Sequence, residues 1–479
     1  MSYEYSQTKI VFTLGPATDS EEMMEQLVRR GVDVCRLNMA HGTHEWVRES
    51  ISRLRSVCDR LGRQVAIMMD VKGPEIRTGA VDEPFMLTKG ERIDLVISEE
   101  VLQKRTTDVR AVTVNYPGLV NDIHEGDTVL VDSGLIRFKV LAVTEDTIEC
   151  EVLIPGELGS RRHINLPGVT VNLPALTEKD KKDILVGVEG GIVYFALSFV
   201  RQGKDIQEMR EYLRVNGSDA KIIAKIEDQS GIYNLNEIIE ESDGLMVARG
   251  DLGIECPYQT LPLIQRQMIK MCIRHAKPVI VATHMLESMI SAPVPTRAEV
   301  SDIATAIFDK TDAVMLSGET TVGKYPLECV DVMRNIALEV ESNAAPGYDH
   351  SIPLLDLKSK LLRSAVVLAQ ELDNSAILLF TRHGSSAQII ASLRPSHCPI
   401  YAFTDREDTF RRLLLSWGIA PFMLRDLNAS PEETMEAAMK SLRRTAWVKP
   451  GDNVVAITHL SHEAGIIDSI QVREVPETV

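Results

Sequence analysis

Short apolar runs alternate with stretches of helical periodicity along most of the chain. The first three runs cover 9–14, 32–39 and 65–69. Between the last two, Val47, Ile51, Leu54, Cys58 and Leu61 repeat at spacings of four and three, which places them on one helix face. Runs of strand length that alternate with helices are typical of βα units and predict a parallel sheet.

The alternation stops near position 74 and resumes after 174. The interval holds six short β-like runs separated by Asn, Asp and Gly, without a strong helix pattern. This pattern predicts a small antiparallel β domain inserted into the α/β chain. Five more strand–helix pairs follow the insertion. Three strands before it and five after it give eight βα units, the number that closes a TIM barrel.

A turn-rich segment at 343–347 (NAAPG) indicates a further domain boundary. Strands and helices alternate again beyond it, over a length sufficient for a separate three-layer α/β domain. We therefore expect a barrel with an inserted β-barrel lid and a C-terminal α/β domain. The predicted limits are 1–73 and 169–344 for the barrel, 74–168 for the insertion and 345–479 for the C-terminal domain.

Composition narrows the class of protein. The net charge of −17 disfavours nucleic acids and anionic membranes as partners. No apolar run reaches the roughly 20 residues of a membrane span, and the first five residues lack the pattern of a signal peptide. The seven cysteines are scattered without a CxxC pair, which fits free thiols in a reducing compartment. We predict a cytoplasmic protein.

Charged residues gather at the predicted carboxyl ends of the strands, where TIM barrels carry their chemistry. Lys225 and Glu227 alternate within one apolar run, so their side chains share a face. A surface strand with an exposed charge pair is the alternative, but the apolar neighbours favour a buried strand. Glu227 and Asp251 follow adjacent strands, and two such carboxylates suit Mg²⁺. The remaining cations of this rim, which predict an anionic and phosphorylated substrate, are Arg36, Arg77, Arg201 and Arg249.

Seven segments resemble the pyruvate kinase family, in the family's order and over essentially the whole chain. They are 8–17 (TKIVFTLGPA), 36–42 (RLNMAHG), 72–79 (KGPEIRTG), 223–227 (IAKIE), 246–253 (MVARGDLG), 282–289 (ATHMLESM) and 315–320 (MLSGET). The resemblance implies a barrel domain, a β-rich lid and a C-terminal α/β domain. It also implies transfer of a phosphoryl group from phosphoenolpyruvate to ADP, and a homotetramer.

The resemblance assigns substrate and magnesium residues. Glu227 and Asp251 would hold Mg²⁺, with Mn²⁺ as an alternative ion. Lys225 would stabilise the phosphoryl group in flight, and Arg36 would bind the same phosphate. Thr283 would lie beside the methylene carbon of the enolate, near the proton source. The remaining expectation is that backbone N–H groups of Gly250 and Asp251 cradle the substrate carboxylate at a helix N-terminus.

Nucleotide and potassium residues follow from the same resemblance. The expected nucleotide contacts are Asn38, His41, Trp46, Arg77 and Arg161. The expected K⁺ ligands are Asn38, Asp70 and the carbonyl of Val71. Ala40 stands where the family's serine usually completes the potassium site, whereas Glu75 is the residue type that accompanies K⁺ dependence. We therefore expect a K⁺ requirement with a weakened site.

Other positions depart from the family. His284 replaces a usual glutamine and Asp228 a usual asparagine. Thr381, Gly384 and Ser386 match the family's effector loop, but the residues at 383 and 385 do not, and 460–470 lacks the loop expected for fructose 1,6-bisphosphate. The loop is either an ordinary helix cap or a phosphate site. We predict a phosphorylated effector other than that bisphosphate.

Two other functions are compatible with parts of the pattern. A Mg²⁺-dependent pyruvate lyase would share the barrel, but it leaves Arg77, the insertion and the C-terminal domain unexplained. A metabolite sensor without turnover would keep the pocket, yet the chain retains Lys225, Glu227, Asp251 and Thr283. A test for pyruvate formation separates these readings.

Overall fold

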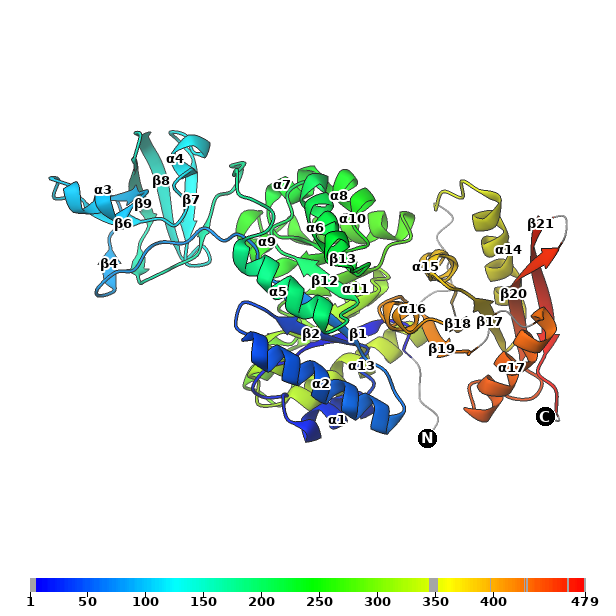
Figure 1. Cartoon of the computed structure of the whole chain (residues 1–479). Coiled ribbons are helices and arrows are strands. Elements are labelled where there is room, and N and C mark those ends of the chain that lie inside the picture. The colour runs from blue at the N-terminus through cyan, green and yellow to red at the C-terminus, as the bar shows by residue number, and fades with distance from the viewer. Residues whose placement is uncertain are drawn as a thin grey trace.

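The computed structural model describes residues 6–343, 352–396, 398–425, 427, 430–462 and 465–477. The predicted boundary at 343–347 and the first five residues therefore lie almost entirely outside the described residues. A central barrel carries a β-rich unit on one side and an α/β unit on the other (Figure 1). In the part of the chain that is described, no helix combines the length and apolar character needed to cross a membrane.

Eight parallel strands close the central barrel, in the order β1-β16-β15-β14-β13-β12-β3-β2. Each strand of the closed sheet is almost wholly buried, as expected when helices cover the outside and side chains fill the inside. The predicted TIM barrel is thereby confirmed. The strands are β1 (Lys9–Thr13), β2 (Val34–Asn38), β3 (Ala66–Val71), β12 (Tyr194–Leu197), β13 (Lys221–Ile226), β14 (Gly244–Ala248), β15 (Val279–Ala282) and β16 (Ala313–Met315).

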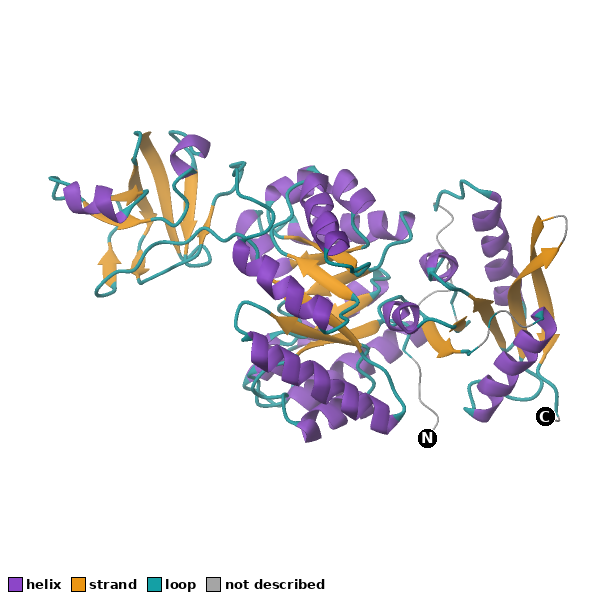
Figure 2. Cartoon of the chain, in the orientation of Figure 1, coloured by secondary structure: helices purple, strands orange, loops and turns teal. Residues whose placement is uncertain are grey.

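Helices surround the barrel (Figure 2). Several begin at a Ser or Thr whose side chain accepts a backbone N–H of the first turn, namely Ser20, Thr43, Thr177 and Thr296. The long helices are α1 (Glu21–Arg29), α2 (His44–Leu61), α5 (Glu178–Glu189), α6 (Gly203–Val215), α8 (Leu235–Glu241), α10 (Leu261–Arg274), α11 (Arg297–Phe308) and α13 (Pro326–Asn343). Short helices follow four of the strands: α7 (Gln229–Tyr233), α9 (Arg249–Glu255), η1 (Glu287–Ile290) and α12 (Gly318–Thr321).

The insertion between β3 and β12 is β-rich, as predicted, with a six-stranded sheet and a two-stranded sheet. The expectation of a purely antiparallel unit is wrong in one place, because β5 and β6 pair in parallel across a helical connection. The insertion also contains two short helices that the sequence pattern did not indicate. Its elements are β4 (Phe85–Leu87), β5 (Arg92–Val96), α3 (Glu99–Lys104), β6 (Arg110–Thr113), α4 (Leu119–Asp122), β7 (Thr128–Val131), β8 (Ile136–Val143), β9 (Thr147–Ile154), β10 (Gly156–Leu158) and β11 (Ile164–Asn165).

The C-terminal unit is a five-stranded sheet with helices on both faces, as expected for three layers. Alternate residues of β17 serve the two faces: Ile377 and Leu379 pack in the same cluster as α14 and α15, whereas Leu378 packs with α17. The strand order is β19-β18-β17-β20-β21, and only β21 runs antiparallel among the described strands. The elements are α14 (Leu357–Glu371), β17 (Ser375–Phe380), α15 (Ser385–Ser392), β18 (Ile400–Thr404), α16 (Glu407–Leu413), β19 (Ile419–Met423), α17 (Pro431–Arg444), β20 (Asn453–His462) and β21 (Gly465–Glu474).

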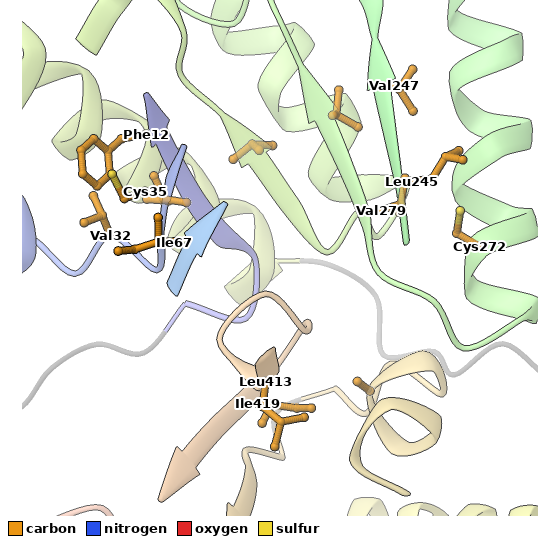
Figure 3. Packing of buried hydrophobic residues seen from close by; sticks show 14 of the residues in the cluster. Phe12, Val32, Cys35, Ile67, Leu245, Val247, Cys272, Val279, Leu413 and Ile419 are labelled. Carbon is orange, nitrogen blue, oxygen red and sulfur yellow. The ribbon is translucent and has the colours of Figure 1, made fainter. Parts of the chain in front are cut away.

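The C-terminal unit closes the amino-end floor of the barrel. Leu414 and Leu415 pack in one cluster with Val11, Val34 and other inward residues of the barrel strands. Leu413 and Ile419 lie below β1 and β2 in Figure 3, in the same continuous core as Phe12 and Cys35. The chemistry at the opposite, carboxyl end of the barrel therefore sits on a floor that is packed from below.

Candidate active site

A cavity of about 600 Å³ opens at the carboxyl ends of the barrel strands, below the inserted β unit. Both units line it. The barrel contributes Arg36, Asn38, Ala40, His41, Asp70, Lys72, Ser198, Phe199, Lys225, Glu227 and Asp251, and the insertion with its connections contributes Glu75, Arg77, Asp132, Ser133, Ser160, Arg161, Arg162 and His163. The ends of β2, β3, β12, β13 and β14 thus converge on one space, whereas Gly250 and Thr283 are not among its lining residues.

Lys225 lies at the centre of this space and is only 8% exposed. Its ammonium group contacts Glu227 Oε1 at 3.0 Å and Asp70 Oδ1 at 3.1 Å, and it donates to Ser198 Oγ at 2.7 Å. The other Glu227 oxygen, Oε2, accepts the backbone N–H of Phe199 at 2.7 Å. The exposed-strand alternative for Lys225 and Glu227 is therefore wrong, because both side chains are buried and paired.

Asp70 connects Lys225 to Arg36. The Arg36 Nε donates to Asp70 Oδ2 at 2.6 Å, and its Nη1 donates to Thr13 Oγ1 at 3.1 Å. Burial alone would raise the pKa of Asp70, but Arg36 and Lys225 outweigh that cost and lower the pKa. Asp70 therefore stays ionised and holds two cations at the cavity floor.

The two carboxylates predicted for magnesium differ from Asp70, because the pKa of each is raised rather than lowered. Burial raises the pKa of Glu227, and the nearby Asp251 raises it further although Lys225 opposes the shift. Burial also raises the pKa of Asp251, with Glu75 and Asp70 adding to the effect. For Lys225, burial would lower the pKa, yet Asp70 and Glu227 reverse that and raise it. Lys225 therefore offsets only part of the cost of burying the Glu227 and Asp251 carboxylates.

The donor set fits Mg²⁺. Among the described residues, no group of three or more His, Cys, Asp or Glu is arranged to hold a metal ion. Two hard carboxylates bordering a large polar cavity are the arrangement that Mg²⁺ takes when water and substrate oxygens complete its shell. A divalent cation bound between the two carboxyls would lower both of these raised pKa values.

Thr283 and Gly250 contact each other at the ends of the adjacent strands β14 and β15. The Thr283 Oγ1 accepts the backbone N–H of Gly250 at 2.7 Å and donates to the carbonyl of Ala282 at 2.7 Å. Thr283 has φ +67, a left-handed conformation that is costly for a β-branched residue. The Gly250 N–H is thus already occupied in this arrangement.

The expected nucleotide residues divide into two groups. Asn38, His41, Arg77 and Arg161 line the cavity, and Arg77 Nη1 donates to the Arg161 carbonyl at 2.9 Å. Trp46 does not line the cavity. Its ring lies against Gly42, its indole Nε1 donates to Asp19 Oδ2 at 3.4 Å, and it packs partly on the barrel core.

The expected potassium ligands lie together but are engaged by donors of the chain. Asn38 Oδ1 accepts the Ala40 N–H at 3.1 Å, and the Val71 carbonyl accepts from Ser198 Oγ at 2.8 Å. Each oxygen keeps a second lone pair, and Asp70 is ionised, so the donor set still suits a monovalent cation. Ala40 contributes no side-chain oxygen to this group.

Arg201 and Arg249 do not belong to the cationic rim, contrary to the sequence prediction. Arg249 donates to the carbonyls of Ala282 and Thr283 and pairs with Asp302. Arg201 donates to two carbonyls of the returning lid connection, at Val171 and Leu173. Both guanidinium groups satisfy backbone acceptors at buried loop junctions, so they are structural cations rather than free phosphate donors.

Reasoning from the sequence placed Ser198 at a strand end without giving it a role, and it did not name the cavity residues Phe199 and His163. Ser198 Oγ binds Lys225, Phe199 has φ +53 and donates its N–H to Glu227, and the His163 ring lies 5.9 Å from the Phe199 ring. Burial lowers the pKa of His163. Phe199 carries the same sequence signal as Ser198, because both directly follow an apolar run and so lie where the strands of a TIM barrel end.

The predicted effector loop lies between β17 and α15. Gly384 has φ +86 and forms the helix cap, and its N–H donates to Thr381 Oγ1 at 2.9 Å. Ser386 is buried in the first turn of the helix. Of the segment 460–470, residues 463 and 464 lie outside the described residues, so the expectation for that loop stays a prediction.

Comparisons with known proteins agree with this geometry. A family model for the pyruvate kinase barrel domain matches residues 5–330, and one for the pyruvate kinase alpha/beta domain matches residues 359–473. Pyruvate kinase of Staphylococcus haemolyticus is 43% identical over 94% of this chain and 77% of its own length.

Pyruvate kinase isozyme G, chloroplastic, of Nicotiana tabacum is 42% identical over 94% of this chain and 80% of its own. A crystal structure of a pyruvate kinase from Cryptosporidium parvum superimposes with a TM-score of 0.92 at 32% identity, covering 98% of this chain and 96% of that one. The chain therefore belongs to the pyruvate kinase family.

Proposed function

We propose that this protein transfers the phosphoryl group of phosphoenolpyruvate to ADP, giving pyruvate and ATP. The observation that carries the proposal is the convergence of Lys225, Glu227 and Asp251 on one polar cavity at the carboxyl end of a closed barrel. A lyase needs no lid-borne Arg77 and Arg161 opposite those residues, and a sensor needs no buried lysine held by three acceptors. Phosphoryl transfer uses both features.

Phosphoryl transfer depends mainly on positioning and on neutralising the charge of the moving group. In our proposal Lys225 and Arg36 contact the phosphate oxygens, and Asp70 fixes the direction of both cations. Arg77 and Arg161 hold the nucleotide phosphates from the wall formed by the insertion, and Asn38 and His41 contact the nucleotide from the barrel. Trp46 stays a prediction as a base contact, and a change of its rotamer would be needed to release it from Asp19.

The second half of the reaction protonates the enolate carbon. Thr283 is proposed to lie beside that carbon, with its hydroxyl oriented by the Ala282 carbonyl. A substrate carboxylate would take the place of Thr283 Oγ1 as the acceptor of the Gly250 N–H, with the Asp251 N–H beside it. The lid formed by the insertion would exclude water and limit hydrolysis of the phosphoryl donor.

Glu227 and Asp251 would hold Mg²⁺, or Mn²⁺ in its place. When bound, the ion would supply positive charge that orients the phosphoryl group and stabilises the transition state. Asn38, Asp70 and Val71 would hold K⁺, with affinity reduced because Ala40 lacks a hydroxyl. Full activity in potassium-free buffer would contradict the potassium part.

Regulation and assembly are proposed at a coarser level. We keep the domain limits 1–73, 74–168, 169–344 and 345–479, with the insertion as lid and the C-terminal unit as regulatory domain. Thr381, Gly384 and Ser386 are proposed to bind a phosphorylated effector other than fructose 1,6-bisphosphate, in a cytoplasmic homotetramer. Sugar monophosphates and AMP are the first compounds to test.

Pyruvate formation from phosphoenolpyruvate and ADP, coupled to NADH oxidation, tests the proposal. Lys225→Met should lower kcat at least about a hundredfold, because a preorganised cation at the moving charge is worth about 2.7–4 kcal/mol. Lys221→Met is the matched control, since Lys221 lies on the same strand but pairs with Asp243 outside the cavity. Pyruvate formed by C–C bond cleavage of a 2-oxo acid, without phosphoenolpyruvate or ADP, would favour a lyase, and substrate binding without turnover would favour a sensor.

A further inference from the structure

Ser198 occupies a position that neither the motifs nor the comparisons assign. It follows β12 directly, is 4% exposed and lines the cavity. Its Oγ donates to the Val71 carbonyl at 2.8 Å, with Asp70 Oδ1 farther away at 3.3 Å. Because a hydroxyl has one proton, its lone pairs remain for Lys225, whose Nζ donates to it at 2.7 Å.

Lys225 has three N–H donors and three close acceptors. The distances are 2.7 Å to Ser198 Oγ, 3.0 Å to Glu227 Oε1 and 3.1 Å to Asp70 Oδ1. A lysine ammonium has no fourth proton. A phosphate oxygen therefore accepts a hydrogen bond from Lys225 only if one of these acceptors gives up its own.

The three acceptors differ in how firmly they are committed to Lys225. Glu227 is a proposed magnesium ligand, and Asp70 is shared with Arg36 at 2.6 Å. Ser198 is neutral, and its hydroxyl proton is donated in a hydrogen bond to a backbone carbonyl of the neighbouring strand β3. A cation that competes for the two carboxylates leaves the hydroxyl in place. Ser198 is thus the acceptor that stays when the charges around Lys225 change.

We infer that Ser198 is a positioning residue that anchors the Lys225 ammonium at the phosphoryl site through the backbone of β3. The inference rests on the proposed function, because it concerns the lysine that stabilises the moving phosphoryl group. The Ser198 hydroxyl, at the end of β12, thus connects Lys225 of β13 to the Val71 carbonyl of β3 by two hydrogen bonds. In this arrangement Glu227 is the acceptor that Lys225 exchanges for a phosphate oxygen.

Steady-state kinetics of Ser198→Ala test the anchor. Removing a hydrogen bond to a charged group should lower kcat about tenfold to a hundredfold and leave KM for phosphoenolpyruvate little changed. Ser198→Thr, which keeps the hydroxyl, should recover most of the loss. Ser392→Ala is the matched control, because Ser392 is 3% exposed and donates to the Ile389 carbonyl at 2.7 Å, far from the cavity.

A second measurement does not need turnover. Crystal structures of the full-length wild type, S198A and S392A show where the Lys225 ammonium group lies. Without the Ser198 hydroxyl, S198A should move that ammonium group away from the end of β12, whereas S392A leaves it in place. Equal kinetics in S198A and S392A, or an unmoved Lys225 ammonium group in S198A, would overturn the inference, as would a loss in S198T equal to that in S198A.

The two proposals fail in distinguishable ways. If the wild-type protein forms no pyruvate from phosphoenolpyruvate and ADP, the proposed function is wrong, and the position of the Lys225 ammonium group in S198A still decides whether Ser198 anchors it. If pyruvate forms but S198A behaves as S392A does, the proposed function is supported and the inference that Ser198 anchors Lys225 is wrong.

Discussion

Glu255 shows at the scale of one residue how the lid connection joins the barrel. It ends α9, is buried, and its carboxylate accepts from the Asn165 side chain and the Leu166 backbone at the end of the insertion. Gln229 donates to its backbone carbonyl at 2.6 Å. Burial raises the pKa of Glu255 to about 7, and the nearby carboxyls of Asp228 and Asp251 contribute.

This raised pKa predicts a loss of stability as pH rises. A carboxyl with a raised pKa in the folded state favours folding fully below its unfolded pKa of about 4.3, and that contribution disappears as pH passes 7. The unfolding free energy of Glu255→Gln, relative to that of the wild type, should therefore rise by up to about 3 kcal/mol as the pH is raised from 4.5 to 8. Guanidinium unfolding across that range measures it, and the exposed Glu240→Gln serves as control. A difference that does not change with pH would contradict the prediction.

The position of a residue could be predicted from the sequence where the regular backbone of a strand determines which way its side chain points. Lys225, Glu227 and Asp70 were expected at strand ends because strand periodicity fixes the face on which a side chain lies. Arg201 and Arg249 obeyed the same rule for position, yet their long side chains turn to backbone carbonyls of loops. The path of a loop, and hence the acceptors it presents, is set by tertiary contacts that a single sequence does not display. The same reason hides the contact of Ser198 with Val71.

Element boundaries followed the apolar pattern closely in the barrel. The predicted run at 9–14 contains β1, and that at 32–39 contains β2. The helices α9 and α12 escaped prediction because stretches of seven and four residues are too short to show a helical period. The parallel pairing of β5 and β6 escaped it because strand direction depends on the chain between the strands, here α3, rather than on the strands themselves.

At Gly187, the close packing of helix α5 on the sheet opposes the higher helix propensity of alanine. It lies within α5, and a Cβ atom there would lie 2.7 Å from the Phe195 ring and 3.0 Å from Met69 Sδ. Alanine normally stabilises a helix interior by about 0.5–1 kcal/mol relative to glycine. Gly187→Ala should instead destabilise the barrel by about 1–3 kcal/mol, because the helix must move away from β12 and β3.

Chemical denaturation of the variant and of Gly253→Ala gives the comparison. Gly253 lies in α9, where an added Cβ would meet only Leu261 Cδ2 at an ordinary 3.6 Å. We expect that variant to be neutral or slightly more stable. If both variants gain stability, close packing of α5 on the sheet is not what requires a glycine at 187.

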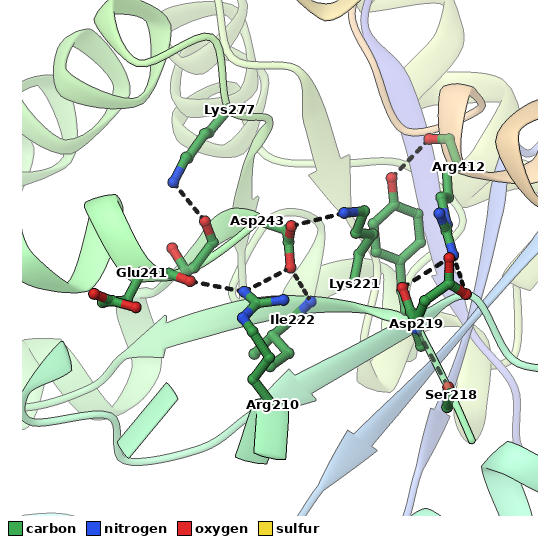
Figure 4. Close-up of polar contacts among 12 residues, drawn as sticks. Arg210, Ser218, Asp219, Lys221, Ile222, Glu241, Asp243, Lys277 and Arg412 are labelled. Carbon is green, nitrogen blue, oxygen red and sulfur yellow. Dashed lines mark hydrogen bonds and ion pairs between the residues drawn. The ribbon is translucent and has the colours of Figure 1, made fainter. Parts of the chain in front are cut away.

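At the scale of the whole molecule, stability depends on the contacts between the C-terminal unit and the amino-end floor of the barrel. Two interdomain ion pairs differ sharply in environment. Arg412 of α16 pairs with Asp219, whose side chain is 82% exposed, and Tyr194 donates to the Arg412 carbonyl at 2.6 Å. Figure 4 shows Arg412 beside Asp219, with the separate Asp243 cluster of the barrel next to them. Arg394 pairs with Asp312 at 2.7 Å where both side chains are nearly inaccessible.

Asp312 is the stronger link because it serves both units at once. Its carboxylate accepts from Arg394, from the Val279 N–H of the barrel at 3.1 Å and from the Trp417 N–H of the C-terminal unit at 3.0 Å. Arg394 also lies over the Trp417 ring at 5.2 Å. An ion pair buried with satisfied hydrogen bonds is costly to break from one side, because the remaining charge stays buried without its partner.

Asp312→Ala should therefore destabilise the protein by about 3–5 kcal/mol, whereas Asp219→Ala, at an exposed pair, should cost less than about 1 kcal/mol. Differential scanning calorimetry should show D312A unfolding its C-terminal unit ahead of the barrel, with D219A close to the wild type. Adding Arg394→Met to D312A removes the stranded charge and should recover part of the loss. Equal costs for D312A and D219A would mean that apolar packing of Leu414 and Leu415, rather than the buried ion pair, holds the floor to the barrel.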